Sequence, residues 1–262
     1  MIINRVLGKV VHRTAKEFFE GNLRNAKLPY FGGQEDSPYF ANIFVFNIPC
    51  RNPFTNEFGI DTSKWEDMSY LLANTSLHQI PIINLTSAKK TYSLFRDAYW
   101  MRSVNIVDGG HIEDALFMFH SCYALKNPPQ VFLKNANDFR FIFYDNRSAE
   151  ALPAIEVSTP TAYSNANFAS DTLRAVTTKI DTTPIRYPDG TTGIPWCCKF
   201  DANFGKARLE HDDVMYLINH LVEDANNTHK HLYLSHYSLS LLSDEEKAIA
   251  TNKGWSLIDN GT

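Results

Sequence analysis

The chain has no apolar run long enough to cross a membrane. It has 262 residues, 44% of them hydrophobic, and no stretch approaches the roughly 18 consecutive apolar residues that a spanning helix needs. Residues 1–9 contain Arg5 and Lys9, but they have no sustained apolar core and no small-residue cleavage site. We therefore expect no membrane insertion and no secretory signal peptide.

Cysteine is also scarce, and its pattern excludes the common cysteine frameworks. The chain has four cysteines, Cys50, Cys122, Cys197 and Cys198, and none of them forms a CxxC pair. The adjacent Cys197 and Cys198 cannot easily bond to each other without backbone strain. This pattern indicates reduced thiols in a protein made in the cytoplasm.

The charges are close to balanced, which argues against nucleic acid as a partner. The formal net charge is −4. Binding to phosphates requires a clustered basic face, and no such cluster stands out in the sequence. We expect no nucleic-acid partner.

Motifs for catalysis are missing as well. There is no HExxH, no phosphate loop and no nucleophile elbow. His229, His231 and His236 are close in sequence, but no further residue supplies the third and fourth ligands that a metal site needs. We expect no catalytic residue, no metal and no cofactor, and hence a protein that is not an enzyme.

What the chain does contain is a regular internal repeat. Successive members of four columns differ by 24 in residue number. The columns are Leu77, Met101, Leu125, Ala149 and Leu173; Ile80, Val104, Pro128, Leu152 and Val176; Ile83, Val107, Val131 and Ile155; and Phe95, Phe119, Phe143 and Asn167. A fixed period of about 20–29 residues is the signature of a leucine-rich-repeat solenoid.

The repeat predicts an α/β solenoid of about five coils. One repeat is too short to bury its own apolar side, so neighbouring repeats must share a core. Residues 77–83 have the apolar spacing of a short strand, and patches such as Leu94 with Phe95 favour a short helical or 3₁₀ return. We expect parallel strands along one face of the stack. Cys122, aligned with Ala98 and Asn146, would suit a tight turn beneath the coil.

The repeat divides the chain into four parts. Residues 1–58 lie outside the repeat, 59–180 hold it, 181–206 break it with turn signals, and 207–262 form a C-terminal cap. The first part is either an N-terminal cap or a segment that anchors the protein in a larger assembly, and the two roles are compatible. Its candidate anchoring residues follow a capping box on a short predicted helix: Phe18, Phe19 and Leu23.

The last two parts carry local signals of their own. Trp196, Phe200 and Phe204 are expected to hold a projecting insertion against the stack. In the cap, a helix is predicted to begin at Asp212 or Asp213. The remaining cap signals predict a strand at Leu232 and Leu234, a capping box at 243–246, a glycine stop at Gly254 and a final strand at 255–258.

Three aromatic residues form the candidate binding surface. Tyr99, Trp100 and Tyr123 come directly after the predicted return segments, where their side chains are expected to be exposed. Exposed aromatic side chains on a rigid scaffold are typical of binding hot spots.

Two kinds of segment resemble a known family. Residues 61–72 and 115–125 resemble the BspA-like leucine-rich repeat, which reads roughly Asp-Thr-Ser and then Met-Ser-x-Met-Phe-x-x-Cys-x-x-Leu. Residues 242–257 look like the end of many phage and gut-bacterial proteins that carry these repeats. Ala149, Pro128, Pro160 and Asn167 depart from the pattern, which predicts looser packing in the last coils.

The resemblance implies recognition of surfaces rather than chemistry. It predicts a structural component of a bacteriophage virion, assembled in the host cytoplasm and oligomeric within its assembly, as a head or tail fibre. The N-terminal segment would contact other virion proteins, and the repeats would bind a host surface glycan or protein, or decorate the particle.

Two other functions remain open from the sequence. A bacterial cell-surface adhesin of the same family predicts an export signal or a wall anchor. A cytoplasmic enzyme or effector predicts convergent polar residues, for which Asp181, Asp189 and His211 are the nearest candidates.

Overall fold

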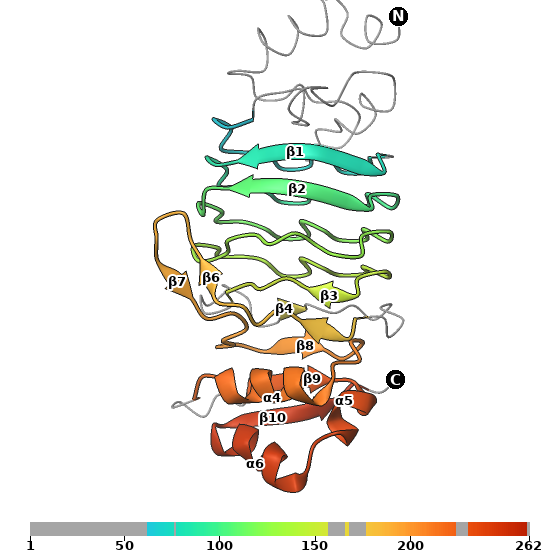
Figure 1. Cartoon of the computed structure of the whole chain (residues 1–262), viewed down its shortest axis with the longest axis vertical. Coiled ribbons are helices and arrows are strands. Elements are labelled where there is room, and N and C mark those ends of the chain that lie inside the picture. Colours follow the sequence, from blue (N-terminus) through green and yellow to red (C-terminus); the bar gives the residue numbers. More distant parts are fainter. Residues whose placement is uncertain (1–61, 76, 157–165, 168–176, 224–229, 261–262) are drawn as a thin grey trace, which may run out of the picture.

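The computed structural model of the chain describes residues 62–75, 77–156, 166–167, 177–223 and 230–260. The predicted anchoring residues Phe18, Phe19 and Leu23 lie outside these ranges, as do Cys50, Leu173 and Val176. Successive repeats lie one above the other along the long axis, from β1 down to the C-terminal helices (Figure 1).

Strands are short, and most of them pair in parallel. Their bounds are β1 Gln79–Leu85, β2 Ser103–Asp108, β3 Ala151–Leu152, β4 Ala166–Asn167, β5 Lys179–Ile180, β6 Ile185–Arg186, β7 Thr192–Gly193, β8 Ala202–Phe204, β9 Lys230–Leu234 and β10 Trp255–Asp259. The helices are α4 His211–His220, α5 His236–Ser240 and α6 Asp244–Asn252.

A first ladder joins the strands that the apolar columns predicted. β1 pairs with β2 in parallel, and Ile80 faces Val104. The register then shifts, so that Ile83 faces Ile106 rather than Val107. The prediction that Val107 is a core residue is therefore wrong: its side chain is 47% exposed. The irregularity moves the apolar position one residue earlier in this repeat.

A second ladder replaces the predicted helical or 3₁₀ returns. The N–H groups of Thr91, Ser93 and Phe95 donate to carbonyl oxygens of the next repeat, at 2.8, 2.9 and 2.9 Å. The N–H groups of Leu94 and Arg96 donate back to the carbonyl three residues earlier. The segment is thus a run of turns in which alternate N–H groups point along the stack, and the helical prediction is wrong there.

Left-handed residues recur at fixed places in these turn runs. Non-glycine residues with φ between 53° and 60° lie at equivalent positions of four repeats: Tyr70, Asn74, Ser93, Asp97, Phe117, Ser121, Phe141 and Asp145. Each such residue costs roughly 1–2 kcal/mol relative to right-handed backbone. The conformation persists because it aims N–H groups at the neighbouring repeat, where a hydrogen bond is available.

An aspartate opens several of the turn runs. The Oδ1 atoms of Asp67, Asp114 and Asp138 each accept the N–H two residues later, at 3.0 Å. Such side-chain bonds favour a turn over a helix. The same three positions are joined through Lys90 by isolated parallel bridges. An aspartate hydrogen bond therefore begins these turn runs at the positions that pair with a neighbouring repeat.

Between the two ladders lies a core of stacked, equivalent side chains. Phe95 stacks on Phe119 at 5.2 Å between ring centroids, and Phe119 stacks on Phe143 at 5.7 Å, with all three fully buried. Met101 and Leu125 are also fully buried, whereas Leu77, in the first described repeat, is half-buried against the same core. The predicted aromatic column is confirmed as far as Phe143.

Cys122 occupies the tight turn predicted for it. Its N–H donates to Oδ1 of Asn146, the equivalent residue of the next repeat, at 2.9 Å, and its Sγ lies 3.2 Å from the carbonyl oxygen of Phe95. Ala98, Cys122 and Asn146 are all fully buried. A small or hydrogen-bonding side chain is needed here because the turn is enclosed by the repeats on both sides.

Toward the C-terminus the second ladder becomes a parallel sheet. β4 lies one repeat after the turn-run residues Ile142 and Phe143, and the strand order is β10-β9-β8-β4, all parallel. β3 and β5 pair separately. Parallel strands therefore form on two sides of the stack, rather than on the single face that the sequence predicted.

The insertion folds back instead of projecting freely. β6 and β7 form an antiparallel hairpin, which Figure 1 shows running back alongside the preceding repeats. Tyr187 of the hairpin contacts Phe132 at 5.2 Å, and the Lys134 Nζ lies 3.3 Å from Oδ2 of Asp189. As predicted, Trp196 and Phe204 are fully buried, and they contact each other. Phe200 packs on Phe139.

The described residues of the C-terminal cap contain three helices and two strands. The predicted capping box is confirmed: Ser243 N–H donates to Glu246 Oε2 at 2.8 Å, and Glu246 N–H donates to Ser243 Oγ at 3.2 Å. Gly254, at φ 81°, follows the end of α6 at Asn252, as the predicted glycine stop requires. Helix α4 begins at His211, earlier than predicted, with Glu210 at its N-cap and no side-chain cap.

Truncating the central stacked ring tests the shared core. We expect Phe119→Ala to lower the free energy of unfolding by about 3–5 kcal/mol, because it leaves a cavity between two buried rings. Ile194→Ala, at a side chain that is 56% exposed, should change it by less than about 0.5 kcal/mol. Equal losses in chemical denaturation would contradict the described packing.

The contact between α4 and α6 predicts a pH dependence. The pKa of His211 is raised, chiefly by its hydrogen bond to Glu246 and then by Asp212. A raised pKa means that the charged contact stabilises the fold fully below about pH 6.5, and that this contribution is lost as pH rises through the folded-state pKa. Glu246→Gln, which can keep the capping box, should lower the His211 pKa in an NMR titration. An unchanged His211 pKa in the variant would show that Glu246 does not cause the shift.

Candidate recognition surface

The structure brings two of the three predicted aromatic residues into contact. Tyr99 and Tyr123 each follow a turn run, held by a hydrogen bond from their own N–H to the carbonyl two residues earlier. Their rings are 4.7 Å apart between centroids and tilted by 30°. The stacking of one repeat on the next therefore converts two distant tyrosines into neighbouring rings.

Arg147 extends this pair into a third repeat. It lies one repeat after Tyr123, its guanidinium carbon sits 4.0 Å from the centre of the Tyr123 ring, and its Nη2 donates to the Tyr123 hydroxyl at 3.3 Å. Nε of Arg147 is 3.0 Å from Oδ1 of the buried Asp145, which fixes its position. Sequence reasoning missed Arg147, although stepping one repeat on from Tyr123 would have found it.

Trp100 is the most exposed large apolar side chain of this surface. It is 61% exposed, against 40% for Tyr99. Its indole stacks against the imidazole of His78 from the preceding repeat, at 6.3 Å and an interplanar angle of 10°. His78 was not predicted as part of the surface, because it and Trp100 do not occupy equivalent positions of the repeat.

The tyrosines differ in accessibility. Tyr123 was expected to be exposed, but it is half-buried because Tyr99 and Arg147 cover it from two sides. Partial burial raises the pKa of Tyr99, and the nearby Asp97 raises it further. The phenol of Tyr99, whose ordinary pKa is about 10, therefore stays protonated at neutral pH. The surface thus offers aromatic rings beside a fixed guanidinium.

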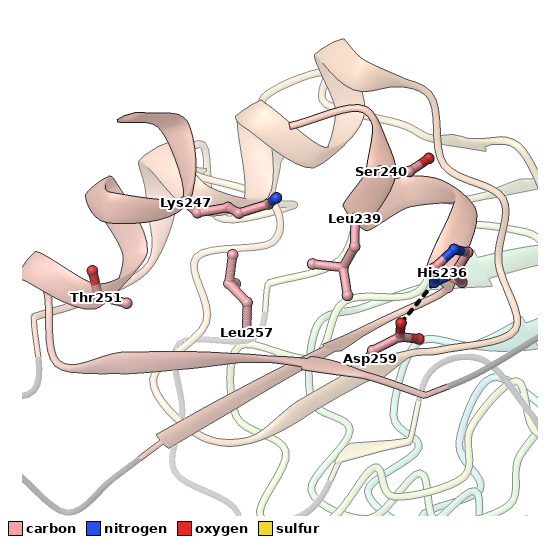
Figure 2. A pocket seen from close by; sticks show the side chains of 7 residues that line it. All are labelled: His236, Leu239, Ser240, Lys247, Thr251, Leu257 and Asp259. Atoms are coloured by element: carbon pink, nitrogen blue, oxygen red, sulfur yellow. Dashed lines mark hydrogen bonds and ion pairs between the residues drawn. The ribbon is translucent and has the colours of Figure 1, made fainter. Parts of the chain in front are cut away.

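A concave region of about 470 Å³ lies in the C-terminal cap, among α5, α6 and β10. Figure 2 shows the side chains that line it: His236, Leu239, Ser240, Lys247, Thr251, Leu257 and Asp259. Nδ1 of His236 lies 2.8 Å from Oδ2 of Asp259. The Ser240 hydroxyl donates to the carbonyl of Tyr237 at 2.7 Å. This hydroxyl is therefore engaged with backbone rather than with the histidine.

The polar residues considered for catalysis are engaged separately. Asp181 accepts the N–H of Thr183, Asp189 contacts Thr191 and Lys134, and His211 contacts Asp212 and Glu246. These contacts give each residue its own partners and do not link the three. His229 lies outside the described residues.

Two kinds of feature are not found among the described residues, a metal-ligand cluster and a membrane-spanning helix. Within it, no three His, Cys, Asp or Glu side chains are gathered in a way that could hold a metal ion. None of the helices described is both long and apolar enough to cross a membrane.

The described thiols are shielded. Cys122 and Cys198 are fully buried, and Cys197 is half-buried. Burial raises the pKa of all three thiols. The thiolate, which is the reactive form, is therefore disfavoured at neutral pH.

Comparison with known proteins returned nothing: no protein-family model, no curated protein and no solved structure matches the chain.

Proposed function

We propose that the chain is a non-enzymatic recognition scaffold built as a leucine-rich-repeat solenoid. The support for this class is the constant repeat period together with the two hydrogen-bond ladders and the stacked rings of Phe95, Phe119 and Phe143. A stack of this kind holds side chains of successive repeats at fixed spacing along a rigid surface. Such a surface suits recognition of an extended partner.

One observation carries the recognition role. The rings of Tyr99 and Tyr123, from two repeats, lie 4.7 Å apart between centroids, and the adjacent Trp100 is 61% exposed. Exposed aromatic side chains on rigid elements favour binding because little conformational entropy is lost on contact. We infer that this surface contacts a glycan or a protein on a host cell.

The proposed setting is a bacteriophage particle. It rests on the resemblance of residues 61–72, 115–125 and 242–257 to phage-type BspA-like repeat proteins. In this proposal residues 1–58 bind neighbouring virion proteins, with several copies in one assembly, put together in the host cytoplasm. The alternative is a bacterial cell-surface adhesin, in which the same aromatic surface would bind and the first segment would serve export or attachment.

Removing the exposed indole tests the binding role. We expect Trp100→Ala to reduce binding of the protein to susceptible host cells at least about tenfold, the size of a hot-spot loss. Its unfolding midpoint should barely change, because the side chain is largely exposed. Ile194→Ala, comparably exposed but on the insertion, is the matched control. Equal binding by wild type and Trp100→Ala would exclude this surface.

Removing residues 1–58 tests the virion setting. We expect the deleted protein to be absent from purified particles in which the full chain is found by mass spectrometry, with Trp100→Ala incorporated normally as the control. Normal incorporation of the deleted protein would remove the anchoring role. Absence of the full chain from particles would favour the adhesin.

A further inference from the structure

A column of polar side chains borders the aromatic surface. His78, Arg102, Lys126 and Glu150 occupy successive repeats, each one repeat period after the one before. The N–H of Arg102 donates to the carbonyl of His78 at 2.7 Å, and the N–H of Glu150 donates to that of Lys126 at 2.9 Å. Backbone hydrogen bonds therefore align Arg102 with His78 and Glu150 with Lys126.

The two cations of this column differ in their electrostatic surroundings. Nζ of Lys126 lies 2.8 Å from Oε1 of Glu150, so its charge is compensated within the column. Arg102 is exposed and makes no ion pair with any residue that the structure describes. The other guanidinium of the surface, Arg147, is paired with Asp145. Among the described residues, Arg102 is thus the guanidinium on this surface left open to an external anion.

Arg102 lies beside the most exposed ring. Trp100 and Arg102 are both exposed, and Met101 between them is fully buried. His78 connects the two, since its ring stacks on Trp100 and its carbonyl accepts the N–H of Arg102. Trp100 and Arg102 are therefore neighbouring exposed residues that share a contact with His78.

The strand surface next to Arg102 is polar without charge. Gln79, Ser103 and Asn105 are exposed on β1 and β2, and Gln79 and Ser103 are register partners. Amide and hydroxyl side chains can each donate and accept hydrogen bonds. An open aromatic ring, an uncompensated guanidinium and neutral hydrogen-bonding groups are therefore carried by neighbouring positions of two adjacent repeats.

We propose that this area, defined by Trp100, Arg102, Gln79, Ser103 and Asn105, binds an acidic glycan, a sugar polymer that carries carboxylate groups. The inference rests on the proposed recognition function and narrows its ligand. The C–H face of a sugar ring packs on the indole, its hydroxyl groups bond to the neutral side chains, and its carboxylate pairs with Arg102. A guanidinium matches a carboxylate with two parallel hydrogen bonds.

An acidic sugar fits this area better than an acidic peptide does. The described strands that carry the area, β1 and β2, pair with each other in parallel, and their exposed side chains are neutral and short. Their amide and hydroxyl groups match closely spaced sugar hydroxyls, whereas an acidic peptide would be favoured by several uncompensated cations. Of the two cations in the column, Arg102 is the one available to bind an anion, since Lys126 is paired with Glu150.

The experiment separates charge from shape with matched probes. Full-length protein is tested against an array of oligosaccharides that contain uronic acids, and against the same oligosaccharides after their carboxyl groups are reduced to alcohols. We expect wild type to bind at least one acidic probe about tenfold more tightly than its reduced form. The preference should shrink at high salt, because the contact is exposed.

Three variants test which residues produce the preference for the acidic probe. Arg102→Gln should lose the roughly tenfold preference while it still binds the reduced probe. Lys126→Gln, one repeat later but already compensated, should keep the preference within about twofold. Trp100→Ala should weaken binding to both probes.

Several results would overturn the proposal. It fails if no acidic probe binds, if reduction of the carboxyl groups leaves affinity unchanged, or if Arg102→Gln behaves as wild type. Binding of polyglutamate as tightly as the acidic sugars would assign the area to acidic peptides instead. If acidic and reduced probes bind equally and Trp100→Ala weakens both, the recognition function stands and the acidic ligand is wrong.

Discussion

Backbone hydrogen bonding between equivalent residues of neighbouring repeats is the constraint on which the structure depends. It acts on two sides, through the β1–β2 pairing and through the turn runs whose alternate N–H groups reach the next repeat. Because this pairing keeps equivalent residues of neighbouring repeats in register, equivalent side chains stack on one another along the axis. The stack of Phe95, Phe119 and Phe143 follows from that register. The left-handed residues of the turn runs are tolerated because the register gives their N–H groups partners.

The same constraint produces the outer surface. Tyr99, Tyr123 and Arg147 occupy equivalent places, so the spacing of the repeats sets the ring separation of 4.7 Å and places the guanidinium over the second ring. Charges are compensated in the same way, as Lys126 and Glu150 show. Departures from compensation are therefore informative, and Arg102 is such a departure next to an exposed indole. The proposed binding area is thus distinguished by an unpaired cation in the column of equivalent polar residues, rather than by a separate pocket.

Patterns with a local or periodic cause could be predicted from the sequence. The apolar columns placed Phe95, Phe119 and Phe143 in the core, and the capping box at 243–246 needed only a short local motif. The turn runs could not be predicted in the same way, because apolar spacing near Leu94 is compatible with a helical turn. What decides against a helix is an inter-repeat hydrogen bond, which no local pattern contains. The exposure of Val107 likewise follows from a register shift between two strands.

By itself, the sequence determined which residues are equivalent, since a constant spacing needs no knowledge of the path that the chain takes. The position of Tyr99, Trp100 and Tyr123 directly after the predicted return segments named them as members of a surface. Only the tertiary structure decided which of them remain open to solvent, because exposure depends on what the adjacent repeat places on top. Tyr123 is covered by Arg147, Trp100 is not, and His78 joins the surface through a contact outside the period. Equivalence between residues of different repeats follows from the sequence alone, whereas the solvent exposure of a side chain depends on which residues lie next to it in the fold.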